Sequence, residues 1–452
     1  MIQDTLKVFR DPIYQLISFD KEKDKPVLDI IDTPEFQRLR RIRQLGFSCY
    51  TFPGSVHDRF SHSIGVAHIV GEMIDSLNIP EPIVIPQIDQ DVKIDKYQIK
   101  LLLQLTGLLH DIGHGPFSHT FEKNSKVNHE KVSKEIIRSS ELSISNILDN
   151  QKDELLKKYS KKWIIEILSG AFKPVWIREL ISSQIDADRI DFLLRDAYMC
   201  GVKYADFDWK WLFLHMEIEK IPSEHNRLGL VINASKGIHA LESFIISRYH
   251  MYEQVYFHKT TRCLETLVGI IFLRLGELLN EKKLRNISFL DNSLPEFIKD
   301  HNNLNAFLKL DDFYMFTQFN IWTYNCNDEI LQELCKCIME RNVFKMFGET
   351  TDEDLLTDKQ LLAINNLLGD KFEYYYFKDS YLNSPYKDNY LLGRKDPESA
   401  EHIWLKTTQG LKEFSQCSPI IKSLHNKDIK KRRVYIHRRY LDDINKILNL
   451  KS

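Results

Sequence analysis

The sequence lacks any apolar run long enough to cross a membrane. Of its 452 residues, 43% are hydrophobic, but no stretch approaches the roughly 18 consecutive apolar residues of a spanning helix. The first twelve residues, MIQDTLKVFRDP, also lack the apolar segment of a secretory signal. We therefore expect a globular protein of the cytoplasm, with no membrane partner.

An excess of charge and a disulfide framework are also missing. The formal net charge is -2, so overall electrostatics give no reason to expect nucleic acid as a partner. The seven cysteines are an odd number and widely scattered, which favours a reducing compartment. Cys335 and Cys337 are too close and too isolated for a structural zinc site, and we interpret them as helix-packing residues.

The most informative stretch is LLHDIGHGPFSH at residues 108–119. An apolar helical run ends in the adjacent pair His110-Asp111, glycines and a proline break the helix, and His114 and His119 follow. Imidazole and carboxylate groups are ligands that borderline and hard divalent metals prefer. Two adjacent ligands can share one ion only where the backbone turns, and a helix end provides that turn. The stretch therefore predicts a metal-centred active site.

Two further segments offer ligands. His62 precedes an amphipathic helix that extends to about Leu77. A lone histidine there is more often a cap or a core residue, but the His110-Asp111 pair alone leaves a metal site incomplete. In the second segment, Asp188 and Asp196 share one helical face. Three aspartates within six residues, at 186–191, are more than a helix interior normally tolerates, so one of them should bind something.

Basic and aromatic patterns leave alternatives open. Asp32-Thr33-Pro34-Glu35 predicts a helix start, and the helix should end near Gly46. Its four arginines within six residues, at 38–43, form either a solvated face or an anion-binding surface. Arg248, Tyr252 and Tyr256 follow at helical spacing. On the residues alone they favour a packed face with a snorkelling cation over a pocket for phosphate and sugar.

The rest of the chain is interpreted more coarsely. Residues 1–30 should form short strands or loops, and residues 79–99 a surface excursion. Beyond about residue 280 we expect charged helices at 297–308, 329–341 and 358–368, a strand at 372–377, and a basic end. The predicted fold is mainly α, with a helical core at 1–280 and a smaller mixed α+β C-terminal lobe at 281–452.

Taken in order, His62, His110-Asp111 and Asp188 follow the H…HD…D pattern of HD-domain metalloenzymes. DIGHGPFSH after His110 resembles the deoxynucleoside triphosphate (dNTP) triphosphohydrolases of that superfamily. DTPEFQRLR at 32–40 and FPGSVHDRFSHS at 52–63 are similar to the branch typified by the vertebrate SAM-and-HD-domain dNTPase, over roughly residues 5–265. We expect no SAM domain before the core. The fold implied is an HD-domain helical core.

The resemblance implies a role for each matching position. His62, His110, Asp111 and Asp188 would hold a divalent metal (Fe, Mn, Zn or Mg), with Mg on the triphosphate. The implied catalytic residues are His114 at the α-phosphate, His119 as general acid oriented by Glu122, and His129. The implied substrate-binding residues are Arg59, Arg189 and Arg248 for the triphosphate, Gln44 and Asp196 for the 3′-hydroxyl, and Tyr252 and Tyr256, with Tyr256 against C2′. Phe192 and Tyr252 replace a tyrosine and a histidine of the family. The products would be a deoxynucleoside and inorganic triphosphate.

The resemblance also implies regulation. Its allosteric positions for a guanine nucleotide or dNTP match Lys7, Val8, Asp32, Gln37 and Arg40, so a homodimer or homotetramer is expected. Lys236 matches a second phosphate-binding position, whereas Trp211 and Ala234 depart from that pattern.

Two other functions compete with this interpretation. An HD phosphodiesterase or nuclease acting on nucleic-acid ends is supported only by the basic residues at 430–439. A nucleotide-sensing protein that has lost catalysis is disfavoured, because an inactive site would have no reason to keep all four metal ligands.

Overall fold

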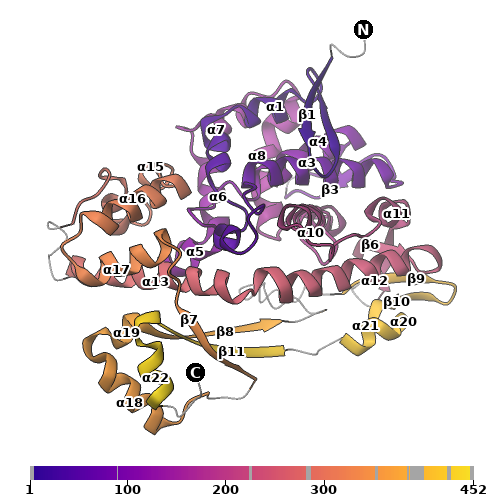
Figure 1. Cartoon of the computed structure of the whole chain (residues 1–452). Coiled ribbons are helices and arrows are strands. Elements are labelled where there is room, and N and C mark those ends of the chain that lie inside the picture. Colours follow the sequence, from indigo (N-terminus) through magenta and orange to yellow (C-terminus); the bar gives the residue numbers. More distant parts are fainter. Residues whose placement is uncertain are drawn as a thin grey trace.

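The computed structural model describes residues 5–88, 90–222, 227–280, 287–351, 355–383, 386, 402–424 and 429–447. Helices dominate (Figure 1). In this view α12 (Ala234–Met251) and α13 (Lys259–Asn280) cross the molecule, with N-terminal helices above them. A small sheet that includes β8 (Tyr376–Asn383) and β11 (Ile429–Ile436) lies below. The predicted mainly α fold with a smaller mixed C-terminal region is confirmed.

The N-terminal half is a set of helices joined by short loops. A hairpin of β1 (Leu6–Asp11) and β2 (Gln15–Asp20) comes first, and β3 (Ile83–Ile85) pairs with β4 (Val92–Ile94). The helices are α1 (Lys25–Ile31), α2 (Pro34–Gln37), α3 (Arg59–Ser76), α4 (Lys96–Leu109), α5 (His119–Ser125), α6 (His129–Arg138), α7 (Ser143–Asp149), α8 (Glu154–Leu168), α9 (Val175–Glu179), α10 (Ala187–Cys200) and α11 (Trp209–Leu214).

Helices α3, α4 and α10 form the frame of the site, because α3 packs against both of the others. Val66 and Val70 of α3 and Leu102 and Leu105 of α4 are completely buried. The predicted apolar face of α3 thus lies in the core, as the helical spacing indicated. This packing brings the start of α3, the end of α4 and the start of α10 together.

The helix predicted from Asp32 to Gly46 is much shorter than expected. The α-helical part, α2, ends at Gln37, a 3-10 turn covers Arg38–Arg41, and Ile42 is extended. Arg38 is 2% exposed and donates to the carbonyls of His114 and Leu310 at 2.9 and 2.8 Å. Arg38 therefore belongs neither to a solvated face nor to an anion-binding surface, because its guanidinium binds the loop that follows α4.

The chain after α11 contributes two sheets and further helices. The first sheet has the order β10 (Gly410–Glu413), β9 (Trp404–Thr407), β6 (Arg227–Asn233) and β5 (Met216–Ile221); the second has the order β7 (Lys345–Thr350), β11 (Ile429–Ile436) and β8 (Tyr376–Asn383). The helices are α14 (Ser293–Lys299), α15 (Leu304–Phe307), α16 (Asp312–Tyr324), α17 (Glu329–Met339), α18 (Asp358–Leu368), α19 (Phe372–Tyr375), α20 (Phe414–Cys417), α21 (Pro419–Leu424) and α22 (Leu441–Ile447).

Several sequence predictions for this part of the chain can now be compared. Helices α17 and α18 occur where expected, and Cys335 and Cys337 are buried on α17. The helix expected at 297–308 is two helices, α14 and α15, and the strand expected at 372–377 begins only at Tyr376, after α19. Among the described helices none is long and apolar enough to span a membrane.

Candidate metal centre and acid–base cluster

The four predicted metal ligands lie at helix ends and meet in space. His62 is in the first turn of α3, His110 caps the end of α4, and Asp188 is in the first turn of α10. His62 Nε2 lies 3.6 Å from Asp111 Oδ2 and 3.1 Å from Asp188 Oδ1. His110 Nε2 lies 3.4 and 3.7 Å from the same two oxygens. Three helix ends thus converge on one point.

The two imidazoles are oriented for metal binding. His62 Nδ1 donates to Asp191 Oδ2 at 2.8 Å, and His110 Nδ1 donates to the Gly107 carbonyl at 2.7 Å. With Nδ1 protonated, each remaining Nε2 can present its lone pair to a cation in the cluster. Both Nε2 atoms are buried and, among the described residues, have no hydrogen-bond partner. Such orphaned buried atoms are rare. A divalent cation would satisfy both, so these residues fit a metal.

The carboxylates of this group are ionised. Burial alone would raise the pKa of Asp111, but the Arg59 guanidinium holds it well below its usual range. Burial likewise opposes ionisation of Asp188, and His110 and His62, when protonated, lower its pKa. The carboxylates in turn raise the pKa of both imidazoles, so the group attracts positive charge, and its mixed nitrogen and oxygen set suits several divalent metals.

Asp191, a residue that sequence reasoning did not assign, fixes His62. It is completely buried and accepts hydrogen bonds from Arg195 Nε and Nη2, both at 2.9 Å, besides the one from His62. Tyr14 Oη donates to its Oδ1 at 2.8 Å. A Cβ on Gly65 would lie 1.9 Å from that oxygen, so only glycine leaves room for the carboxylate. Its position three residues after Asp188 was the available sequence signal.

The predicted catalytic residues form a second group against the first. His114 Nε2 lies 3.2 Å from Asp111 Oδ1, and the His114 ring stacks on His129 with centroids 4.0 Å apart. Glu122 Oε2 accepts from His129 Nδ1 at 2.8 Å and from His119 Nδ1 at 3.3 Å. Burial, reinforced by Arg59, lowers the pKa of His114 well below its usual value. A neutral imidazole thus separates the metal group from the Glu122 pair.

The loop between the two groups has an unusual backbone. Phe117 and Ser118 both have φ of 57°, in the left-handed region that non-glycine residues rarely adopt. Asp312 Oδ1 accepts from the Phe117 N–H at 2.7 Å. Ser118 Oγ donates to the Arg43 carbonyl at 2.9 Å and accepts from Arg59 Nε at 2.7 Å. Strain held in place by its surroundings is common at functional loops.

The residues predicted to bind the sugar also lie together. Asp196 accepts from Tyr256 Oη at 2.8 Å and from His57 Nε2 at 2.7 Å. The rings of Tyr252 and Phe192 lie 4.9 and 6.1 Å from that of Tyr256. His57 belongs to the FPGSVHDRFSHS motif but was not assigned a role. Tyr252–Tyr256 form a π-helical turn, so the expected single α-helical face from Arg248 to Tyr256 is wrong.

The predicted triphosphate-binding arginines all have protein partners. Arg59 Nη1 donates to Asp111 Oδ2. Arg189 Nη1 donates to Asp186 Oδ2 at 2.7 Å, and Arg248, 2% exposed, donates to Gln184 Oε1 at 2.9 Å. Burial raises the pKa of Asp186 to about 6. Gln44 Oε1 is buried and has no hydrogen-bond partner within the described part of the chain.

The predicted allosteric residues lie at the surface of the N-terminal segment. Lys7 and Val8 are exposed on β1, and Asp32 is exposed directly after α1. Arg40 Nε donates to Gln37 Oε1 at 2.8 Å, and the guanidinium carbon lies 3.5 Å from the centroid of the Phe60 ring. Gln37 and Arg40 therefore form one exposed polar pair.

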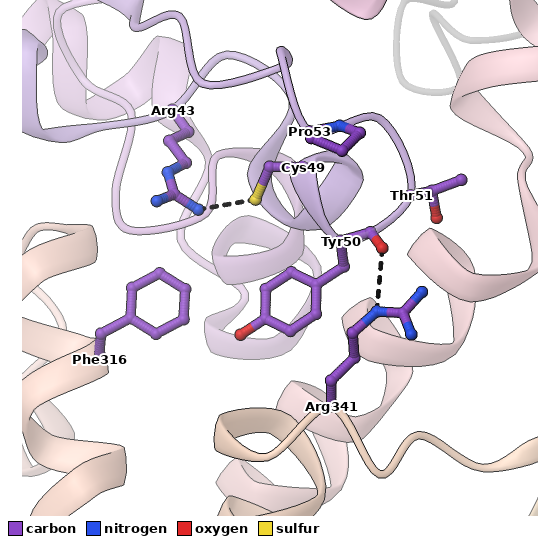
Figure 2. A pocket seen from close by; sticks show the side chains of 7 residues that line it. All are labelled: Arg43, Cys49, Tyr50, Thr51, Pro53, Phe316 and Arg341. Carbon is purple, nitrogen blue, oxygen red and sulfur yellow. Dashed lines mark hydrogen bonds between the residues drawn. The ribbon is translucent and has the colours of Figure 1, made fainter.

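Two other features lie apart from these groups. A hollow of about 620 Å³ is lined by Arg43, Cys49, Tyr50, Thr51, Pro53, Phe316 and Arg341 (Figure 2). In it Arg341 Nε donates to the Tyr50 carbonyl at 3.1 Å, which joins the segment after α17 to the segment before α3. The predicted site residues lie elsewhere.

The other feature is the group of Glu333, Cys337 and His437, whose ligand atoms lie within 4.8 Å of one another. His437 Nε2 donates to Glu333 at 3.1 Å, while Nδ1 accepts from the Arg439 N–H at 3.2 Å. Burial raises the pKa of the Cys337 thiol to about 12. Hydrogen bonds occupy both ring nitrogens, so an ion is not needed to explain this group.

Comparison with known proteins identifies the family. Residues 59–196 match the HD domain and residues 221–293 the HD associated region. The chain is 34% identical to the Bacillus subtilis protein YwfO over 436 residues, 95% of this chain and 92% of that protein. The chain belongs to the HD-domain family. HD domains bind divalent metals, and the cluster of His62, His110 and Asp111 could bind one here.

Two further relatives of this HD-domain chain have names that state a hydrolase activity. A phosphohydrolase structure from Bacteroides thetaiotaomicron is 27% identical, with a TM-score of 0.75, and covers 96% of this chain and 100% of its own. The human deoxynucleoside triphosphate triphosphohydrolase SAMHD1 is 28% identical over 77% of this chain, which spans 56% of the human protein. The chain is thus an HD-superfamily phosphohydrolase related to dNTP triphosphohydrolases.

Proposed function

We propose that this HD-domain protein is a dNTP triphosphohydrolase, which cleaves a dNTP to the deoxynucleoside and inorganic triphosphate. One observation carries the proposal: the His119–Glu122–His129 group is joined to the candidate metal group through His114 and Asp111, which are 3.2 Å apart. An acid positioned beside the metal speeds phosphoester hydrolysis by protonating the leaving group. His62, His110, Asp111 and Asp188 would hold the metal, which supplies an activated water when bound.

The arginines would bind the substrate's phosphates. A triphosphate carries about four negative charges, and guanidinium groups bind phosphate oxygens through paired hydrogen bonds. Arg59 is already held between Asp111 and Ser118, at the junction of the two groups. Arg189 follows Asp188 on α10, and Arg248 is buried near the end of α12. We assign these three to the triphosphate, with His114 beside the α-phosphate.

His119 would protonate the departing 5′ oxygen. Its Nδ1 donates to Glu122, so Nε2 carries the transferred proton. The bond between the α-phosphorus and the 5′ oxygen breaks, hydroxide from water bonds to phosphorus, and the proton of His119 completes the sugar hydroxyl. The proton that the water loses returns through solvent to His119 and restores its acid form. The His119 side chain is 56% exposed, which limits the lowering of its pKa by burial, and its hydrogen bond to Glu122 raises the pKa. The triphosphate's negative charge would raise this pKa further and favour the acid form.

The remaining predicted residues complete the proposal. Gln44 and Asp196 would bind the 3′-hydroxyl, and Tyr252 and Tyr256 would line the sugar, with the Tyr256 ring excluding a ribose hydroxyl. A guanine nucleotide or dNTP would activate a homodimer or homotetramer of the cytoplasm at Lys7, Val8, Asp32, Gln37 and Arg40. In this proposal residues 1–280 form the catalytic core and residues 281–452 pack on it.

Product analysis tests the proposal. The protein is incubated with each dNTP, with and without GTP, and separately with single-stranded DNA, and the products are resolved by chromatography. We expect the incubation with dNTPs to yield deoxynucleoside and inorganic triphosphate. Release of nucleotides from DNA would instead support the alternative function of a nuclease. That alternative is weakened because Lys431 and Arg433 of the basic end pair with Glu253 and Glu349.

A pair of variants tests the acid. His119→Gln should lower kcat by about a hundredfold or more, the usual contribution of a positioned acid. His239→Gln is the matched control, because the His239 side chain is 89% exposed and contacts Glu242 away from the site. Equal activity of the two variants would contradict the assignment of His119.

A further inference from the structure

The C-terminal strand β11 contacts the turn that carries the tyrosines of the proposed sugar pocket. This turn, Tyr252–Tyr256, is π-helical, and the Phe257 N–H closes it by donating to the Tyr252 carbonyl at 2.9 Å. β11 lies between β7 and β8. Side chains of β8 and β11 reach both ends of the turn, although Lys431 and Arg433 of β11 lie 178 and 176 positions from the residues that they contact there.

At the first end the contact is an ion pair with an added hydrogen bond. Glu253 Oε2 accepts from Lys431 Nζ at 3.1 Å, and its Oε1 accepts from Asn383 Nδ2 at 2.7 Å. The Glu253 side chain is 14% exposed. Because the pair is largely shielded from water and both carboxylate oxygens are used, it orients Glu253 better than an exposed pair would.

At the second end an arginine holds the backbone. Arg433 Nη1 donates to the Phe257 carbonyl at 2.5 Å and Nη2 donates to Tyr381 Oη at 2.9 Å. The Phe257 ring stacks on Tyr381, with centroids 4.3 Å apart. Arg433 is 7% exposed. The carbonyl and the ring of the residue that ends the turn are therefore both fixed by the C-terminal sheet.

These contacts matter because a π-helical turn is rare and occurs frequently at functional sites. An α-helical continuation of α12 would point Tyr256 in another direction, away from its hydrogen bond to Asp196. We propose that Asn383, Lys431 and Arg433 are positioning residues that hold this turn, and thereby set how strongly Tyr252 and Tyr256 select deoxyribose over ribose. This inference rests on the proposed function for its substrate.

The test compares two neighbouring lysines. Lys431→Met removes the ammonium group and keeps most of the stem, and Lys430→Met makes the same change at the preceding strand position, which is exposed and points to the other face. In Lys431→Met we expect the ratio of kcat/KM for dNTP over NTP to fall about threefold or more. We also expect faster hydrogen exchange of the amides of 252–257. Lys430→Met should change neither the sugar ratio nor the exchange rates. Lys431→Arg, which keeps the positive charge, should leave both close to the wild-type values.

Three results would overturn the proposal. The first is unchanged exchange over 252–257 in Lys431→Met, and the second is an equal increase in Lys430→Met. The third is faster exchange with an unchanged sugar ratio, since the sheet would then hold the turn without governing selection. If the wild-type protein hydrolyses no dNTP, the proposed function fails by itself, and the exchange comparison still decides whether β11 holds the turn.

Discussion

Asp191 offers the sharpest separation of metal binding from stability. In Asp191→Asn the amide group would replace an oxygen that accepts from His62 Nδ1 and Arg195 Nε, at 2.8 and 2.9 Å, or the oxygen that accepts from Tyr14 and Arg195. In either orientation the new amide N–H group faces hydrogen-bond donors at a completely buried position. Arg195 also loses the negative charge of Asp191 and retains its ion pair with Asp11, 2.8 Å away. We expect a loss of about 3 kcal/mol in the free energy of unfolding.

The same substitution removes the group that orients His62, so metal affinity should fall about 10- to 100-fold. Asp11→Asn is the matched control, because Asp11 pairs with the same arginine but does not touch His62. Asp11→Asn should lower the free energy of unfolding by about 1 kcal/mol and leave metal affinity unchanged. Calorimetric titration with Mn²⁺ and urea denaturation measure the two quantities. The reasoning is refuted if both variants weaken metal binding equally, or if Asp191→Asn binds as the wild type does.

Three further predictions concern space, pH and regulation. Gly65→Ala should lower the free energy of unfolding by about 1–3 kcal/mol and weaken Mn²⁺ binding, whereas Gly276→Ala, with nothing within 4 Å, should do neither; denaturation and titration compare them. Burial raises the pKa of Asp312 to about 7, so its protonated form stabilises the fold at low pH and this stabilisation is lost as pH rises toward 7. Asp312→Asn should abolish that part of the pH dependence in denaturation between pH values of about 4 and 8. Arg40→Ala should lose nucleotide-dependent activation and assembly in light scattering while the unactivated rate stays similar, and an enzyme that no nucleotide activates or assembles would contradict the allosteric assignment.

The grouping of the site could be predicted from sequence because its key residues lie at helix ends. His110 and Asp111 follow an apolar helix and precede glycines, and His62 begins an amphipathic one. Such positions are marked locally, by capping residues and by the end of apolar periodicity. Helix α18 likewise has a capping box at Thr357, and its predicted bounds agree with the structure.

Long-range contacts could not be predicted in this way. Arg38 has the sequence context of a surface helix, but its guanidinium is occupied by the carbonyls of His114 and Leu310, 76 and 272 positions away. Asp312 accepts a hydrogen bond from the Phe117 N–H, in the loop that follows α4, and no local pattern indicates that pairing. The π-helical turn at 252–256 has no periodicity that would separate it from an ordinary helix.

The adjacency of His110 and Asp111 has a structural consequence beyond metal binding. Asp111 Oδ2 faces the imidazoles of His62 and His110, whereas Oδ1 faces His114, 3.2 Å away. One carboxylate therefore borders both the candidate metal group and the acid–base group. His110 can point only into the metal group, because its Nδ1 is tied to the helix that it caps. The helix end thus fixes one ligand and lets the next residue join the two groups.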